Sequence, residues 1–576
     1  MTDDARPTRT PSAIDAIADQ YVLTLAELNP LGATVMGLSG YDHLMPDLSP
    51  AGHEAGARAA RETLAQLEDA EPVDDTDRVT VAAMRERLGL MLELHEADEL
   101  LGLLNNIASP VQDLRDVFDL MPTDTAEQWG NVASRLEALP TTMAGVVSSL
   151  QLAASRGRVA AIRQVRECAR QADELAGSES FFTKLVRGAA AEQALAQSDD
   201  PAGLASRLEA GAAAARAAYG ELAAYLRDEL TPLAPAEDAF GRERYQLWSR
   251  LFLGATVDLD ETYEWGLAEL DRVVAEQEAV AAEIAGPGAS VEQAIAVLDA
   301  DPTRTLRGTE ALQAWMQETA DAAIDALDGA HFDIAEPLHT LECRIAPTQV
   351  GGIYYSGPSD DFSRPGRMWW SVPPEVTTFN TWREKTTVYH EGVPGHHLQV
   401  AQAVYLRDTL NSWRRLACWV SGHGEGWALY AERLMAELGF LDDPGDRLGM
   451  LDGQRMRAAR VVFDIGVHLG KPCPERWGGG TWDADKAYEF LKSNVNMPEG
   501  FVRFEWNRYL GWGGQAPSYK IGQRLWETIR DETAAARRAQ GLEPDLKEFH
   551  ATALALGSVG LDVLRDALAP AAAPTA

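Results

Sequence analysis

The chain has few cysteines and no long apolar run. Its cysteines are Cys168, Cys343, Cys418 and Cys473. They are widely spaced and form no C-x-x-C pair, which argues against a zinc ribbon or a disulfide framework and predicts free thiols. No apolar run follows a basic stretch at the start, and no segment reaches about 18 uninterrupted apolar residues. We therefore predict a cytoplasmic protein with no membrane partner.

Positive charge is also scarce. The chain has 51 Lys and Arg against 88 Asp and Glu, which gives a formal net charge of −37. Nucleic acid phosphates and anionic lipids are bound by clustered Lys and Arg, so neither is an expected partner. The acidity has two interpretations: solvated acidic faces that keep the protein soluble, or attraction of cationic substrates.

Helical periodicity dominates the first half of the chain. From about Ser12 to Ala330, apolar residues recur at spacings of three and four, as in Leu208 to Leu226. Prolines interrupt this pattern without flexible Gly/Ser runs, so they predict helix ends rather than domain linkers. These prolines include Pro30, Pro72, Pro110, Pro122 and Pro201.

The composition changes after about residue 335. Eleven of the fifteen tryptophans fall between Trp369 and Trp526. Short segments bounded by Gly and Pro there predict strands at 343–346, 352–355 and 368–372. We predict a mainly α protein, a large multi-helix body with a small antiparallel β-sheet. Residues 1–335 would form an N-terminal helical region, 336–568 a catalytic region continuous with it, and 569–576 a disordered tail.

The most informative segment runs from Tyr389 to Gln399 and reads YHEGVPGHHLQ. It contains His390, His396 and His397, three of the chain's eleven histidines. Histidine is the commonest zinc ligand, and a glutamate beside the first ligand, here Glu391, can take a proton from zinc-bound water. The segment therefore predicts a zinc site with Glu391 as general base.

Helix geometry limits which histidines can meet. Two histidine nitrogens on one zinc ion lie within roughly 3.5 Å of each other. In an unbroken helix, six residues advance about 600° and place His396 on another face from His390, while seven place His397 about 10.5 Å up the axis. The Gly-Val-Pro-Gly sequence between them allows two residues to loop out before the helix resumes near His396.

We therefore predict His390 and His396 as metal ligands. His397 is the alternative second ligand, or a residue that supports the ligands. The competing interpretation is a Gly-Pro-Gly turn between two helices, whose histidines only hydrogen-bond the backbone.

A second motif, SGHGEGWALYAERL at 421–434, favours the metal site. An apolar stripe predicts a helix that begins near Glu425, with Glu425 and Glu432 on one face. Glu425 follows His396 by 29 residues, enough for a helix, a turn and a returning helix. We predict Glu425 as the third ligand and Glu432 as the residue that orients a ligand histidine, with a solvated helix glutamate as the alternative for Glu432. His423 is a rival ligand.

Two tyrosines are candidates for stabilising the oxygen that becomes negative during hydrolysis. Tyr509 and Tyr519 lie in 508–520, a Gly-rich segment that cannot form one regular helix. Arg508 or Lys520 in the same segment could meet a substrate carboxylate. Core packing or a structural salt bridge is the alternative for each residue.

Further candidates lie outside these motifs. Asp464 and His468, one helical turn apart, could support the ligands or form a buried structural pair. A strand with Tyr354, Tyr355, Arg367 and Trp369 could align a substrate backbone or simply pack. The full prediction for substrate binding is Tyr354, Tyr355, Arg367, Arg508, Gln515 and Lys520.

The two motifs together resemble the bacterial domain of unknown function 885 family, whose pattern is H-E-x-x-P-G-H-H-x-Q followed by E-G-W-A-x-Y. The resemblance covers nearly the whole chain. Its other matching positions are Pro30, Ala33, Thr34, Gly37, Tyr41, Asp42, Pro46, Asp47, Tyr354, Tyr355, Arg460 to Asp464, His468, Arg508, Tyr509, Gly514, Gln515 and Ser518 to Lys520.

That family is in turn similar to the helical zinc oligopeptidases, in which H-E-F-G-H precedes E-x-P-S-Q-x-x-E. The seven-residue gap between Glu425 and Glu432 repeats the spacing of the two glutamates, while the gap to the second histidine is two residues longer. The resemblance implies a zinc-peptidase-like body, a small sheet that lines a central channel, and peptide substrates.

We predict a zinc-dependent hydrolase, a metallopeptidase that cleaves short peptides with Zn²⁺ as cofactor. One alternative is a catalytically inactive scaffold or peptide-binding protein that zinc stabilises. Another is a zinc hydrolase of a non-peptide amide or ester, since the metal chemistry would be the same. The sequence does not define the oligomeric state.

Overall fold

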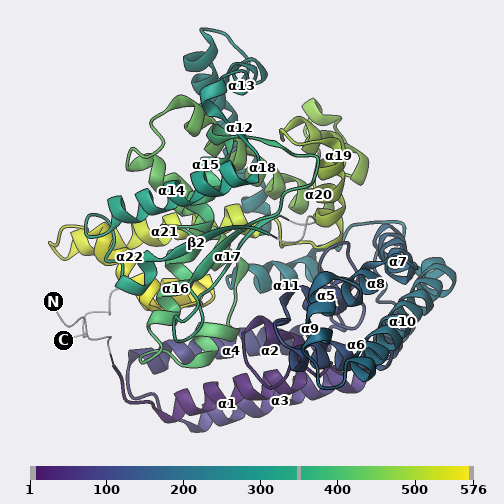
Figure 1. The fold of residues 1–576 in the computed structure, drawn as a ribbon. Helices are drawn as coiled ribbons and strands as arrows, with labels where there is room; N and C mark the ends of the chain where they lie inside the picture. The colour runs from purple at the N-terminus through teal and green to yellow at the C-terminus, as the bar shows by residue number, and fades with distance from the viewer. Residues whose placement is uncertain (1–7, 347–351, 570–576) are drawn as a thin grey trace.

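The computed structural model describes residues 8–346 and 352–569, which fold into a mostly helical body with two small sheets (Figure 1). The predicted tail at 569–576 lies outside the described residues except for Ala569. The helices of the first 230 residues are α1 (Ala13–Leu28), α2 (Pro30–Val35), α3 (Pro50–Asp69), α4 (Asp75–Glu96), α5 (Pro110–Leu120), α6 (Ala126–Ser155), α7 (Ile162–Ala176), α8 (Phe181–Val186), α9 (Ala189–Ala196) and α10 (Pro201–Tyr225).

The rest of the chain is helical with short strands between. Its helices are α11 (Arg242–Leu253), α12 (Leu259–Ala285), α13 (Val291–Asp299), α14 (Thr309–Leu327), α15 (Thr381–Glu391), α16 (His396–Tyr405), α17 (Ser421–Glu437), α18 (Pro444–Leu469), α19 (Ala484–Ser493), α20 (Glu499–Gly511), α21 (Ser518–Ala539), α22 (Leu546–Ala555) and α23 (Leu561–Leu568). Its strands are β1 (Thr305–Arg307), β2 (Leu341–Ile345), β3 (Ile353–Ser356), β4 (Gly366–Trp370) and β5 (Thr378–Asn380). The mainly α class is therefore confirmed.

Several helices start at prolines, as the pattern of breakers predicted. Pro30, Pro110 and Pro201 each stand at the start of a helix, where the N–H that proline lacks would have no partner within the helix. The Asn29 side chain accepts a hydrogen bond from the Gly32 N–H and caps α2. Local sequence thus sets where these helices begin.

Two large apolar cores organise most of the helices. Helices α5 to α10 enclose one core, built from side chains between Leu104 and Leu230. Helices α1, α3 and α4 pack instead with later helices around a second core that runs from Ile14 to Leu564. Figure 1 shows α5 to α10 as a group at the lower right, beside α2 and α4. The predicted boundary at residue 335 stays a prediction.

A buried arginine of α6 holds the segment that follows α1. Arg135 is fully buried and donates hydrogen bonds to the backbone oxygens of Pro30 (3.1 Å) and Leu44 (3.0 Å) and to the Thr34 hydroxyl (2.8 Å). A buried cation is tolerated only with such partners. The opening sequence pattern at 30–47 therefore has a structural role.

The predicted strands are present, each within two residues of its expected bounds. β4 lies between β2 and β3, and β1 pairs separately with β5. The predicted antiparallel pairing holds for β3 with β4 and for β1 with β5, whereas β2 runs parallel to β4. β3 and β4 are consecutive in the chain and run in opposite directions. β2 pairs with the other edge of β4 and runs in the same direction as β4.

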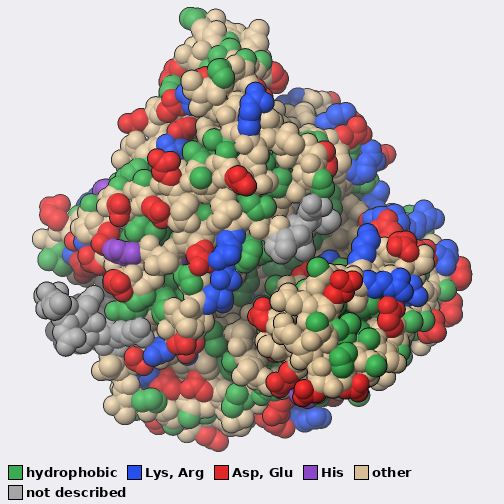
Figure 2. Space-filling view, viewed as in Figure 1, with side chains coloured by type: hydrophobic (Ala, Val, Ile, Leu, Met, Phe, Trp, Pro, Cys, Tyr) green, Lys and Arg blue, Asp and Glu red, His purple; other side chains and the backbone are tan. Residues whose placement is uncertain are grey.

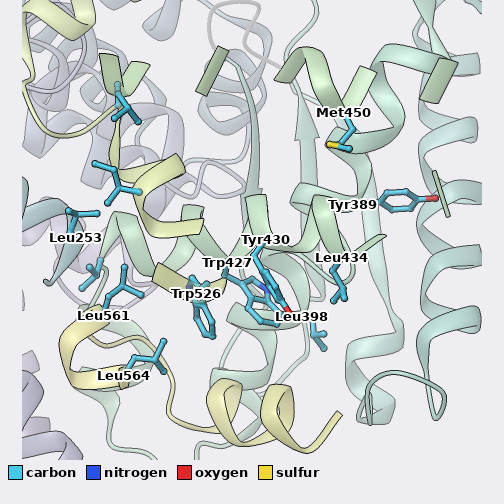
Figure 3. Close-up of a cluster of buried hydrophobic side chains, with 14 of the residues drawn as sticks. Leu253, Tyr389, Leu398, Trp427, Tyr430, Leu434, Met450, Trp526, Leu561 and Leu564 are labelled. Atoms are coloured by element: carbon cyan, nitrogen blue, oxygen red, sulfur yellow. The ribbon is translucent and has the colours of Figure 1, made fainter. Parts of the chain in front are cut away.

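Side chains of α15 to α18 and α21 meet in the centre of the larger core. Figure 3 shows Trp427 and Tyr430 of α17 against Trp526 of α21, with Leu398 of α16 close by. The Trp427 and Trp526 rings are 5.0 Å apart at 62°. Fully burying rings of this size contributes several kcal/mol each, so the relative placement of these helices is strongly held.

The distribution of acidic side chains and the state of the cysteines can be compared with what the composition predicted. Acidic side chains are spread over the visible face rather than gathered in one patch (Figure 2). All four cysteines are free, as predicted, and they are buried. Among the helices of the described ranges, none has the length and apolar character that crossing a membrane requires.

Buried histidines predict a measurable acid sensitivity. Burial lowers the pKa of His550 to about 3, whereas an unfolded histidine titrates near 6.5. As pH falls below 6.5 the unfolded chain takes up this proton and the folded chain does not, so His550 destabilises the fold by about 1.4 kcal/mol per pH unit between 6.5 and 4. In His550→Phe, the free energy of unfolding should therefore fall less steeply as the pH is lowered, by about 1.4 kcal/mol less per pH unit.

Urea unfolding of both proteins at pH 7, 6 and 5 measures this difference. Phe332 stacks on the His550 ring at 5.0 Å, so the site accepts an aromatic ring. His550→Phe also removes the 2.8 Å partner of the Tyr430 hydroxyl, a loss of stability that is the same at each pH. Other groups, such as Asp464, whose pKa burial raises to about 7, titrate equally in both proteins and cancel. Parallel pH curves for the two proteins would contradict the prediction.

Candidate metal centre

The helix that carries the first histidine is interrupted as predicted. α15 ends at Glu391 and α16 begins at His396. The Gly395 N–H donates to the Tyr389 oxygen at 3.1 Å, six residues earlier instead of four. Two extra residues are therefore looped out, and His396 takes the place that the second histidine holds in a regular H-E-x-x-H helix.

The interruption requires glycine at both ends. A Cβ on Gly395 would lie 1.9 Å from the His390 oxygen, and one on Gly392 would lie 2.6 Å from the Val388 oxygen. The fully buried Trp427 donates its indole N–H to the Pro394 oxygen at 2.8 Å, which ties the loop to α17. Backbone contacts thus fix the loop between the two ligand helices.

Gly395→Ala is expected to be strongly destabilising. The added methyl group must displace the backbone at His390, so we expect a loss of about 2–4 kcal/mol in the free energy of unfolding and weaker metal binding. Gly89→Ala in α4 is the matched control, because a Cβ there has no neighbour within 4 Å and should stabilise by about 0.5–1 kcal/mol. Urea unfolding measures both effects; equal stabilities for the two variants would contradict this account of the loop.

His390, His396 and Glu425 meet in one cluster. Their ligand atoms all lie within 4.8 Å of one another. Glu425 Oε2 is 3.3 Å from His390 Nε2 and 3.4 Å from His396 Nε2. Tetrahedral zinc with ligands at about 2.0–2.2 Å holds its ligand atoms about 3.3–3.6 Å apart, whereas a charge-assisted hydrogen bond is about 2.7–2.9 Å long. The donor set and the two spacings that involve Glu425 fit a zinc ion.

The electrostatics of the cluster favour a cation. Burial opposes ionisation of Glu425, but His390 and His396 outweigh it and hold the pKa of Glu425 well below its usual range. Burial also opposes charge on His390, yet contacts with Glu425 and Glu432 raise the pKa of His390 to about 10. Two carboxylates facing one imidazole attract positive charge, which a proton or a metal ion can supply.

Glu432 orients the first histidine, as predicted. The His390 Nδ1–H donates to Glu432 Oε1 at 2.8 Å, which leaves Nε2 free to face the cluster. The Thr386 hydroxyl donates to Glu432 Oε2 at 2.7 Å, so both carboxylate oxygens are engaged. Such a carboxylate partner fixes the tautomer and orientation of a ligand histidine.

A cavity of about 390 Å³ opens beside the cluster and is lined by Glu391, His396 and Glu425. The backbone of α15 places Glu391 next to His390. Burial raises the pKa of Glu391, and His396 partly offsets this. Glu391 is therefore placed to accept a proton from a molecule in the cavity.

His397 does not join the cluster. Its Nε2–H donates to the Leu338 oxygen at 2.8 Å, and its Nδ1 accepts from the Tyr355 hydroxyl at 3.0 Å. Both ring nitrogens are thus occupied, and burial lowers its pKa to about 4. The structure therefore brings His396 and not His397 into the cluster with His390, and His397 instead holds β3 against α16.

The two candidate tyrosines differ in position. The Tyr519 hydroxyl interacts with the Glu425 carboxylate, and burial together with this contact raises the pKa of Tyr519 to about 12. The Tyr509 hydroxyl is fully buried, accepts from Arg460 Nε at 2.6 Å and donates to Glu505. Tyr519 is therefore at the cluster, while the catalytic prediction for Tyr509 is corrected because an ion pair occupies its hydroxyl.

Asp464 and His468 do not support the ligands directly. Asp464 Oδ1 accepts from the Tyr245 hydroxyl (2.7 Å) and the Gly514 N–H (2.8 Å). His468 donates to the Tyr509 oxygen at 2.9 Å. Both side chains are fully buried and hold the Gly-rich loop before α21. The structural alternative is the correct one.

The predicted substrate-binding residues fall into two groups. Tyr354 and Tyr355 line the cavity. The other four are paired with protein groups: Arg367 with Glu342 at 2.8 Å, Arg508 with Gln515 at 2.6 Å, and Lys520 with Glu269 at 2.8 Å. Lys520 is 2% exposed, so its ammonium is a structural charge. The prediction is corrected for Lys520, and Arg367, Arg508 and Gln515 are not among the cavity-lining residues.

Sequence reasoning missed several residues of the cavity wall. Gln399 and His423 line it together, and the exposed Trp419 stands at its rim. Gln399 follows His396 by three residues on a helix, so helical spacing could have identified it. His423 was considered only as a rival ligand, and its ring does not join the cluster.

Fold and cluster together define a class, a helical protein with a buried His-His-Glu centre beside a cavity. The chain belongs to the family described as "Bacterial protein of unknown function (DUF885)", which matches residues 30–568. The predicted family is thus confirmed. A comparison with curated proteins gave no match.

Two solved structures share this fold. A "putative lipoprotein" from Colwellia psychrerythraea is similar with a TM-score of 0.81 and 21% identity, over 96% of this chain and 98% of that chain. A "putative lipoprotein of unknown function" from Shewanella oneidensis has a TM-score of 0.72 and 17% identity, over 96% and 99% of the two chains. At these identities the likeness shows the fold alone. The cytoplasmic location and the similarity to zinc oligopeptidases stay predictions.

Proposed function

We propose that the protein is a zinc-dependent hydrolase, more narrowly a metallopeptidase that cleaves short peptides. The observation that carries the proposal is the meeting of His390, His396 and Glu425 within 4.8 Å, with Glu391 lining the adjoining cavity. Zn²⁺ held by these three residues would supply a Lewis acid that polarises a carbonyl group and lowers the pKa of water towards about 7.

The chain's own residues supply the proton transfers. Glu391 accepts a proton from the attacking water, and its burial makes it a stronger base than an exposed glutamate. It then passes the proton to the leaving nitrogen. The Tyr519 hydroxyl, beside Glu425, donates to the oxygen that becomes negative. Glu432 keeps His390 in the tautomer that can bind metal.

Peptide substrates are supported by the edge of the sheet. β3 is the last strand of the order β2-β4-β3 within the described ranges, and its Tyr354 and Tyr355 line the cavity. An extended peptide can add to such an edge through main-chain hydrogen bonds. The cavity would then be the inner end of the channel that the resemblance implies.

Metal analysis of the untagged protein, followed by digestion of a peptide library with mass readout, tests the proposal. We expect one zinc per chain, cleavage that stops when the metal is removed, and recovery when zinc is returned. Cleavage that survives complete metal removal, or a chain that binds no zinc, would overturn the proposal.

A further inference from the structure

Two side chains in the cavity wall each keep one polar atom without a protein partner. His423 is 2% exposed and Gln399 is 7% exposed, and both line the cavity beside Glu391. Among the described residues, His423 Nε2 and Gln399 Oε1 have no hydrogen-bond partner. A buried polar group left unpaired costs about 1–3 kcal/mol, so two of them in one wall indicate an expected ligand.

The pair has a defined hydrogen-bond polarity. Gln399 Nε2 lies 3.2 Å from His423 Nδ1 and 3.4 Å from the His423 backbone oxygen. A backbone oxygen only accepts, so the side of Gln399 that faces it is the NH₂ group. That NH₂ donates to His423 Nδ1, which places the ring proton on Nε2. His423 Nε2–H is therefore a free donor and Gln399 Oε1 a free acceptor.

The pair lies next to the metal cluster. Gln399 follows His396 on α16 by three residues, a rise of about 4.5 Å. His423 precedes Glu425 by two residues at the start of α17. The two helices thus carry two adjacent cross-contacts, His396 with Glu425 and Gln399 with His423. The same cavity touches His396, Glu425, Gln399 and His423, so a substrate that reaches from the cluster along it would meet the donor and the acceptor.

We propose that Gln399 and His423 bind one amide group of the substrate, adjacent to the bond that is cleaved. The amide carbonyl accepts from His423 Nε2–H, and the amide N–H donates to Gln399 Oε1. This rests on the proposed hydrolase function and specifies its substrate class. An ester has no N–H, so it would leave Gln399 Oε1 unpaired and bind more weakly. The pair therefore selects peptides against esters and depsipeptides.

The test combines binding with amide-to-ester replacement. A peptide cleaved by the zinc-loaded full chain, taken from a tryptic digest of serum albumin, is resynthesised with each uncleaved amide replaced in turn by an ester. Binding of each analogue is measured by calorimetry to zinc-loaded Glu391→Gln protein, alone and combined with Gln399→Leu, His423→Phe or His423→Gln. Gln402→Leu is the matched control, because Gln402 lies on the same helix and does not line the cavity.

We expect one ester position to weaken binding about tenfold or more, and this loss to fall below twofold in Gln399→Leu but persist in Gln402→Leu. His423→Phe should weaken the all-amide peptide about tenfold, and His423→Gln, which keeps an N–H donor, should recover part of the loss. Zinc content should be unchanged in all variants.

The outcomes separate the two proposals. Suppose that peptides are cleaved but each ester weakens binding equally in the protein with Gln399 and in Gln399→Leu. The amide assignment is then overturned, while the proposed hydrolase function is supported. If zinc-loaded protein cleaves esters and no peptide, the amide assignment is likewise overturned. If no cleavage occurs, digest peptides retained by the protein in equilibrium dialysis replace the cleaved peptide. Dependence of their binding on Gln399 would then support the amide site while the hydrolase falls, and failure to retain any peptide would overturn both.

Discussion

Glu391→Gln is expected to leave zinc bound while slowing peptide hydrolysis by about a thousandfold or more. The side chain keeps its size but loses the ability to accept a proton, and general base catalysis contributes about 10²–10⁴ in rate. Glu391 contributes no atom to the His390, His396 and Glu425 cluster, so the ligands should stay in place. The expected signature is a fall in kcat with unchanged metal content.

Glu384→Gln is the matched control for this experiment. Glu384 lies on the same helix, seven residues before Glu391, and does not line the cavity. Burial raises the pKa of Glu384 to about 7. Its carboxyl group is therefore already partly uncharged at neutral pH, and its replacement should change kcat less than twofold. Metal content and kcat of both purified proteins decide the matter. Equal turnover in Glu391→Gln and the unchanged protein would reject Glu391 as the base.

The meeting of His390 and His396 could be predicted from the sequence because local geometry determines it. Helical rise and angle exclude a regular helix from His390 to His396, and the glycines and proline between them allow a loop of two residues. The Gly395 N–H to Tyr389 oxygen contact has the offset this predicts. Glu432 could be assigned for the same reason, since one helix face carries it together with Glu425.

The environment of each tyrosine could not be predicted. Tyr509 and Tyr519 stand ten residues apart in a Gly-rich segment, and no local rule says which one reaches the cluster. The choice depends on α18, whose buried Arg460 binds the Tyr509 hydroxyl together with Glu505. Such contacts join segments more than 40 residues apart, where periodicity carries no information.

Charge alone was similarly ambiguous for Lys520. Its position in the motif suggested substrate binding, but Glu269 of α12 lies 2.8 Å from its ammonium group. A buried lysine needs such a partner, and only the packed fold shows that α12 supplies it. The role of a residue whose partner lies on a distant helix can therefore be assigned only from the structure. The interruption of the helix at the candidate centre could be predicted from the sequence.

Glu425→Gln is expected to reduce zinc affinity more than about a hundredfold. Structural zinc sites bind with about 10–16 kcal/mol from four ligands, or about 3 kcal/mol for each ligand. Glutamine keeps the shape of the side chain but removes the negative charge that faces His390 and His396 at 3.3 and 3.4 Å. Hydrolysis should fall with metal occupancy and recover in part at high zinc concentration.

Competition with a chromogenic chelator measures the affinity, and the rise in Tm on adding zinc gives a second readout. Glu437→Gln is the control, because Glu437 ends the same helix and its side chain is 58% exposed. Zinc should raise the Tm of the control as much as that of the unchanged protein, and raise that of Glu425→Gln far less. Equal zinc affinity in all three proteins would mean that the metal binds elsewhere, and the candidate centre would lose its third ligand.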